Sequence, residues 1–246
     1  AIVAPHLAAI AESGVKLISN AGGVNPEACG RTIRQLIEDA GLPLKVAVIT
    51  GDDLMPKLDQ VLDSEPAEMF TGEPTPAREA IASANAYLGA FPIAEALNQG
   101  ADIVVTGRCV DSAVTLGACI HRFGWQRNDL DLLAAGSLAG HLIECGPQAT
   151  GGNYTDWQEV ADTLHEVGYP IAEIAEDGGV VMTKPKGTGG CVTIGTVGEQ
   201  LLYEIGDPAA YYLPDVICDF TQVSLDQIDT ERVSVTGARG RGVPAQ

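Results

Sequence analysis

Three short apolar segments, each followed by a glycine-containing or polar turn, limit the fold of this chain more than any other feature. They cover residues 16–19, 45–50 and 102–106. Each is too short for a helix, and the last two are rich in Val and Ile, which is typical of buried strands. Segments with helical patterns separate them at lengths that suit parallel crossovers. The sequence therefore predicts an α/β protein with an open, mostly parallel sheet and helices on both faces.

This alternation stops near Gly146, where the pattern changes. Two strand-like segments, 171–174 and 180–183, flank a glycine-rich turn and indicate a hairpin. We therefore expect residues 1–146 to form a parallel α/β domain and residues 147–246 a smaller mixed α+β section on the same core. The first domain is expected to lack an N-terminal section. Later patterns predict a helix at 197–205, strands at 216–220 and 232–235, and a loop at 240–244.

Charge and hydropathy exclude several classes of protein. The 14 basic residues stand against 33 acidic ones, a formal net charge of −19. A nucleic-acid binder needs cations to replace phosphate counterions, so neither nucleic acid nor an anionic membrane surface is an expected partner. No apolar run reaches the roughly 18 residues of a membrane span, and no signal peptide is visible. We expect a cytoplasmic protein whose six cysteines, which include no CxxC pair, are free thiols.

The predicted sheet also locates a site, because ligands of open parallel sheets bind beyond the carboxyl ends of the strands. Three turns are expected to converge there. Their candidate residues are Asn20, Gly22, Gly23 and Asn25 after the first strand, Asp52 and Asp53 after the second, and Gly107, Arg108 and Asp111 after the third.

These residue types fit binding and acid–base chemistry on an anionic substrate. Gly22 and Gly23 let the backbone approach a ligand, and the following helix N-terminus favours an anion. Arg108 offers a fork for carboxylate or phosphate, while Asp111 or Asp52 would act as catalytic base. The alternative is that the Asn and Asp side chains only cap the helices that follow. The turns match neither GxGxxG nor GxxxxGK[ST], which argues against nicotinamide and P-loop nucleotide binding.

A possible metal site lies further along the chain. His141 and Glu144 are three residues apart and share one face of a predicted helix, so both side chains can reach one divalent metal. Asn153 or Asp156 would supply a third ligand. The alternative is a helix end that carries a hydrogen-bonded histidine.

Two polar, glycine-rich loops are further candidates for substrate binding, since long polar loops inside compact domains are often functional. The alternatives are an ordinary surface turn for the first and a solvated basic loop for the second. The candidate residues are Thr150, Gly151, Gly152 and Asn153 in the first loop, and Lys184, Thr188 and Gly189 in the second.

Several of these motifs together resemble the acyclic terpene utilisation (AtuA) family and occur in its order along nearly the whole chain. They are residues 19–26 (SNAGGVNP), 107–113 (GRCVDSA), 141–146 (HLIECG), 150–153 (TGGN), 184–190 (KPKGTGG) and 199–208 (EQLLYEIGDP). The resemblance implies a bacterial catabolic protein of citronellol and geraniol breakdown through CoA-linked intermediates. It carries over no catalytic residue.

The leading hypothesis is a lyase or hydratase that acts on a branched acyl or hydroxyacyl carboxylate, with coenzyme A as part of the substrate. Both reactions need a base and stabilisation of an oxyanion. The alternatives are a metal-assisted hydrolase that uses His141 and Glu144, and a non-catalytic acyl-CoA-binding subunit of a carboxylase-type complex. A homo-oligomer and association with an acyl-CoA carboxylase or dehydrogenase are expected partners. No cofactor is firmly implied.

Overall fold

The computed structural model describes residues 2–244, and these form two compact units. The first consists of the residues up to Leu88 together with Ala96–Cys109; the second consists of Gly89–Glu95 and the residues from Val110 onward. Helices α5 (Ala113–Phe123) and α6 (Leu130–Glu144) belong to the second unit. The predicted division into domains 1–146 and 147–246 stays a prediction.

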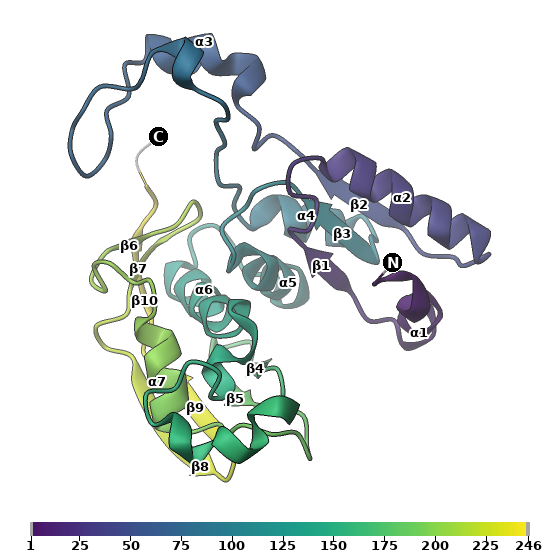
Figure 1. The fold of residues 1–246 in the computed structure, drawn as a ribbon, viewed down its shortest axis with the longest axis vertical. Coiled ribbons are helices and arrows are strands. Elements are labelled where there is room, and N and C mark those ends of the chain that lie inside the picture. Colours follow the sequence, from purple (N-terminus) through teal and green to yellow (C-terminus); the bar gives the residue numbers. More distant parts are fainter. Residues whose placement is uncertain (1, 245–246) are drawn as a thin grey trace. The chain divides into compact units, whose positions relative to one another are not determined.

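The first unit contains the three predicted parallel strands. They are β1 (Leu17–Ser19), β2 (Val46–Ile49) and β3 (Ile103–Thr106), in the order β1-β3-β2 (Figure 1). β3 is the central strand, and all four of its residues are buried. Both neighbours run parallel to it, with Leu17 and Val46 each opposite Ile103. The three carboxyl ends therefore meet at one edge, as the sequence predicts.

Two helices supply the core of the first unit. Helix α1 (Leu7–Ser13) follows the 3₁₀ turn η1 (Ala4–His6), and α2 (Pro26–Asp39) connects β1 to β2. The Asn25 side chain caps α2 by accepting a hydrogen bond from the Ala28 N–H at 2.9 Å. The apolar stripe of α2 packs with α1 against one face of β3. This cluster contains the buried residues Leu7, Ile33, Ile37, Ile103 and Val105.

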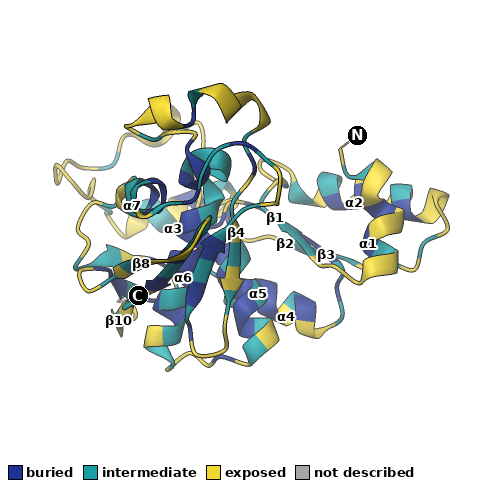
Figure 2. Ribbon diagram, turned by 90° about the horizontal axis from the view of Figure 1, so that it is seen from below, coloured by how far each residue is buried: buried dark blue, intermediate teal, exposed yellow. Residues whose placement is uncertain are grey.

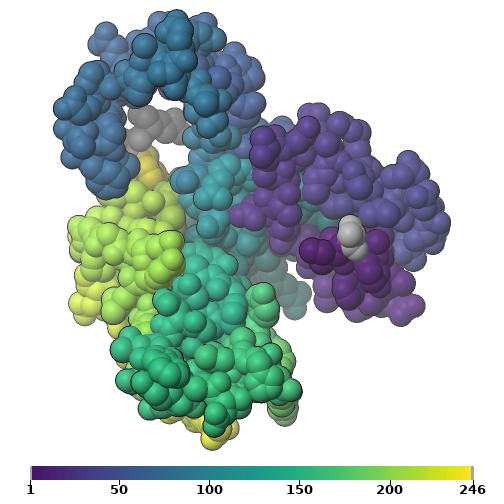
Figure 3. All heavy atoms as spheres, in the orientation of Figure 1, coloured from purple at the N-terminus to yellow at the C-terminus, as the bar shows by residue number. Residues whose placement is uncertain are grey.

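After β2 the chain forms a mostly exposed arm, which ends at the isolated bridge of Asn85 with Asp53 (Figure 3). It contains η2 (Met55–Lys57), α3 (Leu58–Asp63) and η3 (Arg78–Ala80). The residues between α3 and η3 form a loop, which contains an isolated bridge between Ala67 and Pro74. The segment 81–88 contains no regular strand and takes part only in the isolated bridges Asp53–Asn85 and Leu88–Cys109.

The predicted mostly parallel sheet is wrong in extent. Only three strands of the described residues are parallel, and the others form two antiparallel sheets in the second unit. One has the order β4-β5-β9-β8 and the other β10-β7-β6. Their bounds are β4 (Ile171–Ile174), β5 (Val180–Thr183), β6 (Tyr211–Tyr212), β7 (Ile217–Asp219), β8 (Ser224–Asp229), β9 (Arg232–Thr236) and β10 (Arg239–Gly242). The predicted hairpin is confirmed as β4 and β5.

Strand β10 corrects the loop predicted at residues 240–244. It pairs antiparallel with β7, with Arg239 opposite Asp219. Its sequence, Arg-Gly-Arg-Gly, has no strand propensity, so pairing to a neighbour decides its conformation. Gly240 also lies against the Leu130 carbonyl, where a side chain would not fit.

The helices of the second unit form its buried centre (Figure 2). Nine residues of α6 are buried, and Gly140 lets α6 approach the backbone of Ser112, just before α5. Further helices are α4 (Phe91–Asn98), whose residues divide between the units, and α7 (Ile194–Leu202), with 3₁₀ turns η4 (Gly146–Thr150), η5 (Trp157–Glu159) and η6 (Ala161–Glu166). Within the described residues, no helix is long and apolar enough to cross a membrane.

Asp102 joins the amino ends of all three parallel strands, and we expect it to make stability depend on pH. Its carboxylate accepts hydrogen bonds from Lys16 Nζ at 2.8 Å and from the Lys45 N–H at 2.9 Å. Burial raises the pKa of Asp102, but the Lys16 hydrogen bond, the Lys45 amide and both lysine charges outweigh it, so the pKa is lowered. A lowered pKa in the folded state stabilises above the unfolded-state value and loses this contribution as pH falls.

We therefore expect Asp102→Asn to reduce the free energy of unfolding by about 1 kcal/mol at pH 7. The difference from the unmodified protein should shrink as pH falls below about 4. Urea unfolding at several pH values measures this. Glu12→Gln, which removes an exposed carboxylate, is the control. A difference that does not change with pH would contradict the proposed origin.

Candidate functional site

A pocket of about 860 Å³ lies in the first unit at the carboxyl ends of the parallel strands. Predicted residues from all three turns line it, which confirms that the turns converge. It is lined by Gly23, Val24, Asn25, Pro26 and Glu27 after β1, by Thr50, Gly51, Asp52, Asp53 and Met55 after β2, by Arg108 after β3, and by Ala82, Ser83, Asn85 and Tyr87.

Asp52 organises the centre of this pocket. It is buried, with 4% of its surface exposed, and its Oδ2 accepts hydrogen bonds from the Arg108 N–H at 2.7 Å and from Asn85 Nδ2 at 3.2 Å. Gly107 lies so close to this carboxylate that a Cβ atom there would overlap it. Asp52 thus connects the end of β2 to the end of β3 by a hydrogen bond. This contact fixes the backbone of Arg108 and so the position of its side chain.

Arg108 is the cation of the pocket. Its guanidinium carbon stands 4.7 Å from the centre of the Tyr87 ring, and Nη2 lies 3.5 Å from the Tyr87 hydroxyl. Stacking on an aromatic face keeps a guanidinium oriented. Arg108 is itself exposed, so an anion can reach it.

The turn after β1 brings the amino end of α2 to the pocket wall. Gly22 is buried against the Thr106 carbonyl and Pro26, which leaves no room for a side chain. Gly23 has φ of +46°, a conformation that favours glycine. Gly22, Gly107 and Asn20 are not among the lining residues. Gly22 and Gly107 therefore affect the pocket only through the close backbone packing that they allow.

Capping accounts for part of the polar pattern in these turns. Asn25 caps α2, and Asp53 Oδ1 accepts a hydrogen bond from the Met55 N–H at 3.0 Å. Both also line the pocket. Helix capping is therefore confirmed for Asn25, whereas Asp53 accepts from Met55 just before η2, whose cap residue is Leu54. A binding role for both stays a prediction.

Asp111 lies in the second unit and does not line this pocket. Its charge instead acts on Cys145 and Tyr211. Burial raises the pKa of Cys145; Gln200 lowers it, and the charges of Glu144, Glu204 and Asp111 raise it. The role of Asp111 as a base stays a prediction.

His141 and Glu144 contact each other directly. His141 Nδ1 lies 2.9 Å from Glu144 Oε1, and both residues are on α6 as predicted. Across residues 2–244, no group of three or more His, Cys, Asp or Glu side chains has the arrangement of a metal site. The hydrogen-bonded histidine, the alternative to metal binding, is thus what the structure contains. Metal ligation by these residues stays a prediction.

The two polar loops of the second unit, around Thr150 and around Lys184, are joined by backbone hydrogen bonding. The Thr150 hydroxyl donates to the Gly168 carbonyl at 2.6 Å, and the Thr150 carbonyl accepts from the Cys191 N–H. Lys184 Nζ donates to the Thr188 carbonyl at 2.8 Å and lies 3.7 Å from Glu231. Lys184 is therefore not a solvated surface cation. Substrate binding by Thr150, Gly151, Gly152, Asn153, Lys184, Thr188 and Gly189 stays a prediction.

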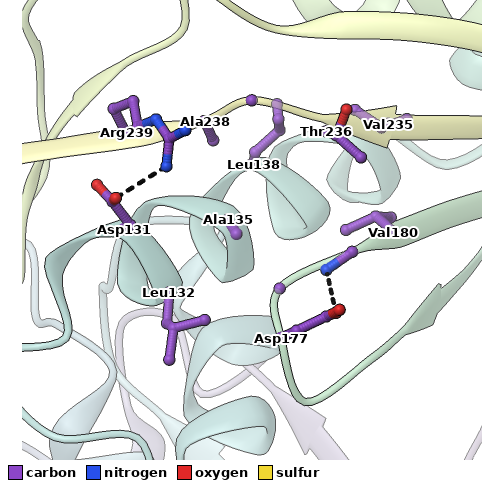
Figure 4. Close-up of a pocket in the computed structure, with 13 residues that line it drawn as sticks. Asp131, Leu132, Ala135, Leu138, Asp177, Val180, Val235, Thr236, Ala238 and Arg239 are labelled. Atoms are coloured by element: carbon purple, nitrogen blue, oxygen red, sulfur yellow. Dashed lines mark hydrogen bonds and ion pairs between the residues drawn. The ribbon is translucent and has the colours of Figure 1, made fainter.

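The second unit contains a separate cavity of about 200 Å³. It lies between α6, the hairpin turn after β4, and β9 and β10 (Figure 4). Asp131 and Arg239 form an ion pair at 2.9 Å on its rim, and Asp177 binds the Gly179 N–H. Both of its carboxylates, Asp131 and Asp177, already have protein partners, so its geometry does not identify a ligand.

The sequence profile of the family described as "Acyclic terpene utilisation family protein AtuA" matches residues 1–246. The chain belongs to this family. Comparison with curated proteins and with solved structures finds no match. Membership in the AtuA family gives the chain a role in acyclic terpene utilisation. It also explains why the motifs of the strand ends and of the second unit occur together in one chain.

Sequence reasoning missed the pocket residues that come from segment 82–87 of this AtuA-family chain, above all Asn85 and Tyr87. The segment has no regular structure, so no periodicity marks it. One signal was present in the sequence: Tyr87 is an aromatic residue in a chain with only 5% aromatic residues.

Proposed function

We propose that this protein is a cytoplasmic catabolic enzyme that binds a branched acyl or hydroxyacyl carboxylate in the pocket of its first unit. The observation that carries the proposal is the 860 Å³ pocket, in which Arg108 and the amino end of α2 both favour an anion. The volume exceeds that of a small acid and accommodates part of a coenzyme A thioester. The chemistry that we favour is that of a lyase or hydratase.

Each step of such a reaction has a candidate residue. Arg108 and the backbone N–H groups near Gly23 would hold the carboxylate or developing oxyanion. Asp52 lines the pocket and is the candidate base there, although its contacts with Arg108 and Asn85 also make it a positioning residue. Asp111, the other base that the sequence predicts, belongs to the second unit and does not line this pocket.

Arg108→Ala is expected to weaken binding of isovaleryl-CoA about 10- to 100-fold, the loss typical of one charge-assisted hydrogen bond. Isothermal titration calorimetry measures it. Arg108→Lys should keep the charge but lose the stacked, forked geometry, and should recover only part of the affinity. Arg78→Ala is the matched control, since Arg78 is in the same unit, pairs with Asp59 and does not line the pocket. Equal losses for Arg108→Ala and Arg78→Ala would exclude Arg108 as the anion-binding residue.

The alternatives differ from this proposal in what the purified protein contains and does. A metal-assisted hydrolase would hold a stoichiometric divalent metal that His141→Gln removes. A non-catalytic subunit would bind acyl-CoA without turnover and co-purify with an acyl-CoA carboxylase or dehydrogenase. Native mass spectrometry with elemental analysis separates these cases and also reveals a homo-oligomer.

A further inference from the structure

A buried imidazole nitrogen in the second unit has no partner in the structure. His141 is 1% exposed, and its Nε2 is the one buried side-chain nitrogen or oxygen among residues 2–244 that makes no hydrogen bond. A buried polar atom without a partner costs free energy, so such atoms are rare and often belong to functional sites. The rest of His141 is firmly held, since its carbonyl accepts from Gln200 Nε2 at 2.8 Å.

Glu144 determines what this nitrogen can do. A carboxylate only accepts hydrogen bonds, so the contact of 2.9 Å places the imidazole hydrogen on Nδ1. Nε2 is then an acceptor with a free lone pair. A carboxylate behind an imidazole also stabilises the imidazolium that forms when Nε2 takes a proton. Glu144 therefore sets the protonation of Nε2 from the opposite side of the imidazole ring, through its contact with Nδ1.

The neighbouring groups indicate which ligand suits this acceptor. The Tyr211 ring centre lies 6.3 Å from that of His141. Burial, followed by the charges of Glu144, Cys218, Glu204 and Asp111, raises the pKa of Tyr211 to about 12, so its hydroxyl stays protonated at neutral pH. Carboxylates so close to the site disfavour an anionic group. A neutral hydroxyl, which donates to Nε2 and accepts from a phenol, is favoured.

We propose that His141 and Glu144 form a general-base dyad that accepts the proton of a substrate hydroxyl group. In this step the O–H bond breaks, its electron pair stays on oxygen, the proton bonds to Nε2, and Glu144 stabilises the imidazolium. The proposal goes beyond the proposed function, because the dyad belongs to the second unit and takes a hydroxylated ligand independently of the pocket in the first unit. Tyr211 is the aromatic neighbour of this dyad. It stands on the two-residue edge strand β6, which pairs only with β7.

The test uses two neutral probes that differ by one hydroxyl, the N-acetylcysteamine thioesters of 3-hydroxy-3-methylbutanoate and of 3-methylbutanoate. In protein with ¹⁵N-labelled histidines, the Nε2 resonance of His141 is assigned by its loss in His141→Gln. The chain has four histidines, so the spectrum is simple. We expect the hydroxylated thioester to shift this resonance and the other thioester to leave it unchanged. An equal response to both probes, or to neither, overturns the proposal.

Two variants test the role of Glu144. Glu144→Gln replaces the carboxylate by a neutral amide, which can donate to Nδ1 as well as accept from it. Nε2 then loses its fixed acceptor role and the imidazolium loses its counter-charge, so the selective shift should weaken. Glu204→Gln is the matched control, since it removes a nearby charge from a residue that contacts Tyr203. Loss of the shift in both variants would overturn the dyad. Retention of the shift in Arg108→Ala would show that this site stands even if the anion pocket of the first unit fails its own test.

Discussion

Asp52→Ala is expected to produce the largest loss of stability in the first unit, about 3 kcal/mol. The buried carboxylate satisfies the Arg108 N–H and the Asn85 amide, and its removal leaves both without a partner and opens a cavity behind Gly107. Because the backbone of Arg108 is then no longer held by Asp52, the affinity for isovaleryl-CoA should fall as well. Urea unfolding and calorimetry measure the two effects.

Two further variants make the Asp52 result interpretable. Asp52→Asn keeps the shape and one accepting oxygen, so it should retain most of the stability lost in Asp52→Ala. If Asp52 is also the catalytic base, Asp52→Asn should still abolish turnover. Asp59→Ala, at an exposed residue paired with Arg78, should cost less than about 0.5 kcal/mol. A stable, fully binding Asp52→Ala protein would show that the ends of β2 and β3 are held by other contacts.

Gly189→Ala is expected to destabilise the second unit by about 3 kcal/mol, because the added methyl group would overlap the Thr163 carbonyl. Both backbone groups of Gly189 are also engaged: its N–H donates to the Glu166 carbonyl at 2.7 Å, and its carbonyl accepts from the Gly168 N–H. The segment therefore cannot move aside without breaking these bonds. The loss should appear as a lower urea midpoint with an unchanged slope.

Gly206→Ala is the control for Gly189→Ala, since nothing lies within 4 Å of a Cβ at Gly206. It should change stability by no more than about 0.5 kcal/mol. The two variants also test whether the loop at residues 184–190 only stabilises the second unit or also contacts substrate. If Gly189 only locks the loops together, Gly189→Ala should leave the affinity for isovaleryl-CoA unchanged below its melting temperature. A stable variant with weakened binding would restore the prediction that this loop contacts substrate.

Local sequence determined the elements whose residues carry their own structural signal. The three parallel strands lie within one residue of their predicted positions, because short runs rich in Val and Ile bounded by polar turns bury well only as strands. Asn25-Pro26 opens α2, since an Asn cap and a proline at the first helical position are local preferences. The place of the pocket followed from the same strands.

Tertiary structure decided the elements that have no such signal. β10, with its Arg-Gly-Arg-Gly sequence, is a strand only because β7 lies beside it. Asn85 and Tyr87 reach the pocket from an irregular segment whose path depends on hydrogen bonds to Asp52 and its neighbours. Asp111 follows Arg108 by three residues, yet its charge acts on the end of α6.

The sequence by itself determined the family, the three parallel strands and the chemistry available at their ends, because each depends on residue types at short spacing. Only the tertiary structure decided that Asp52 holds Arg108 in place, that Tyr87 stacks on it, and that Glu144 leaves His141 Nε2 as a buried acceptor. These relations join residues that are up to 56 positions apart or depend on burial. Distance and burial are set by packing, which no local pattern encodes.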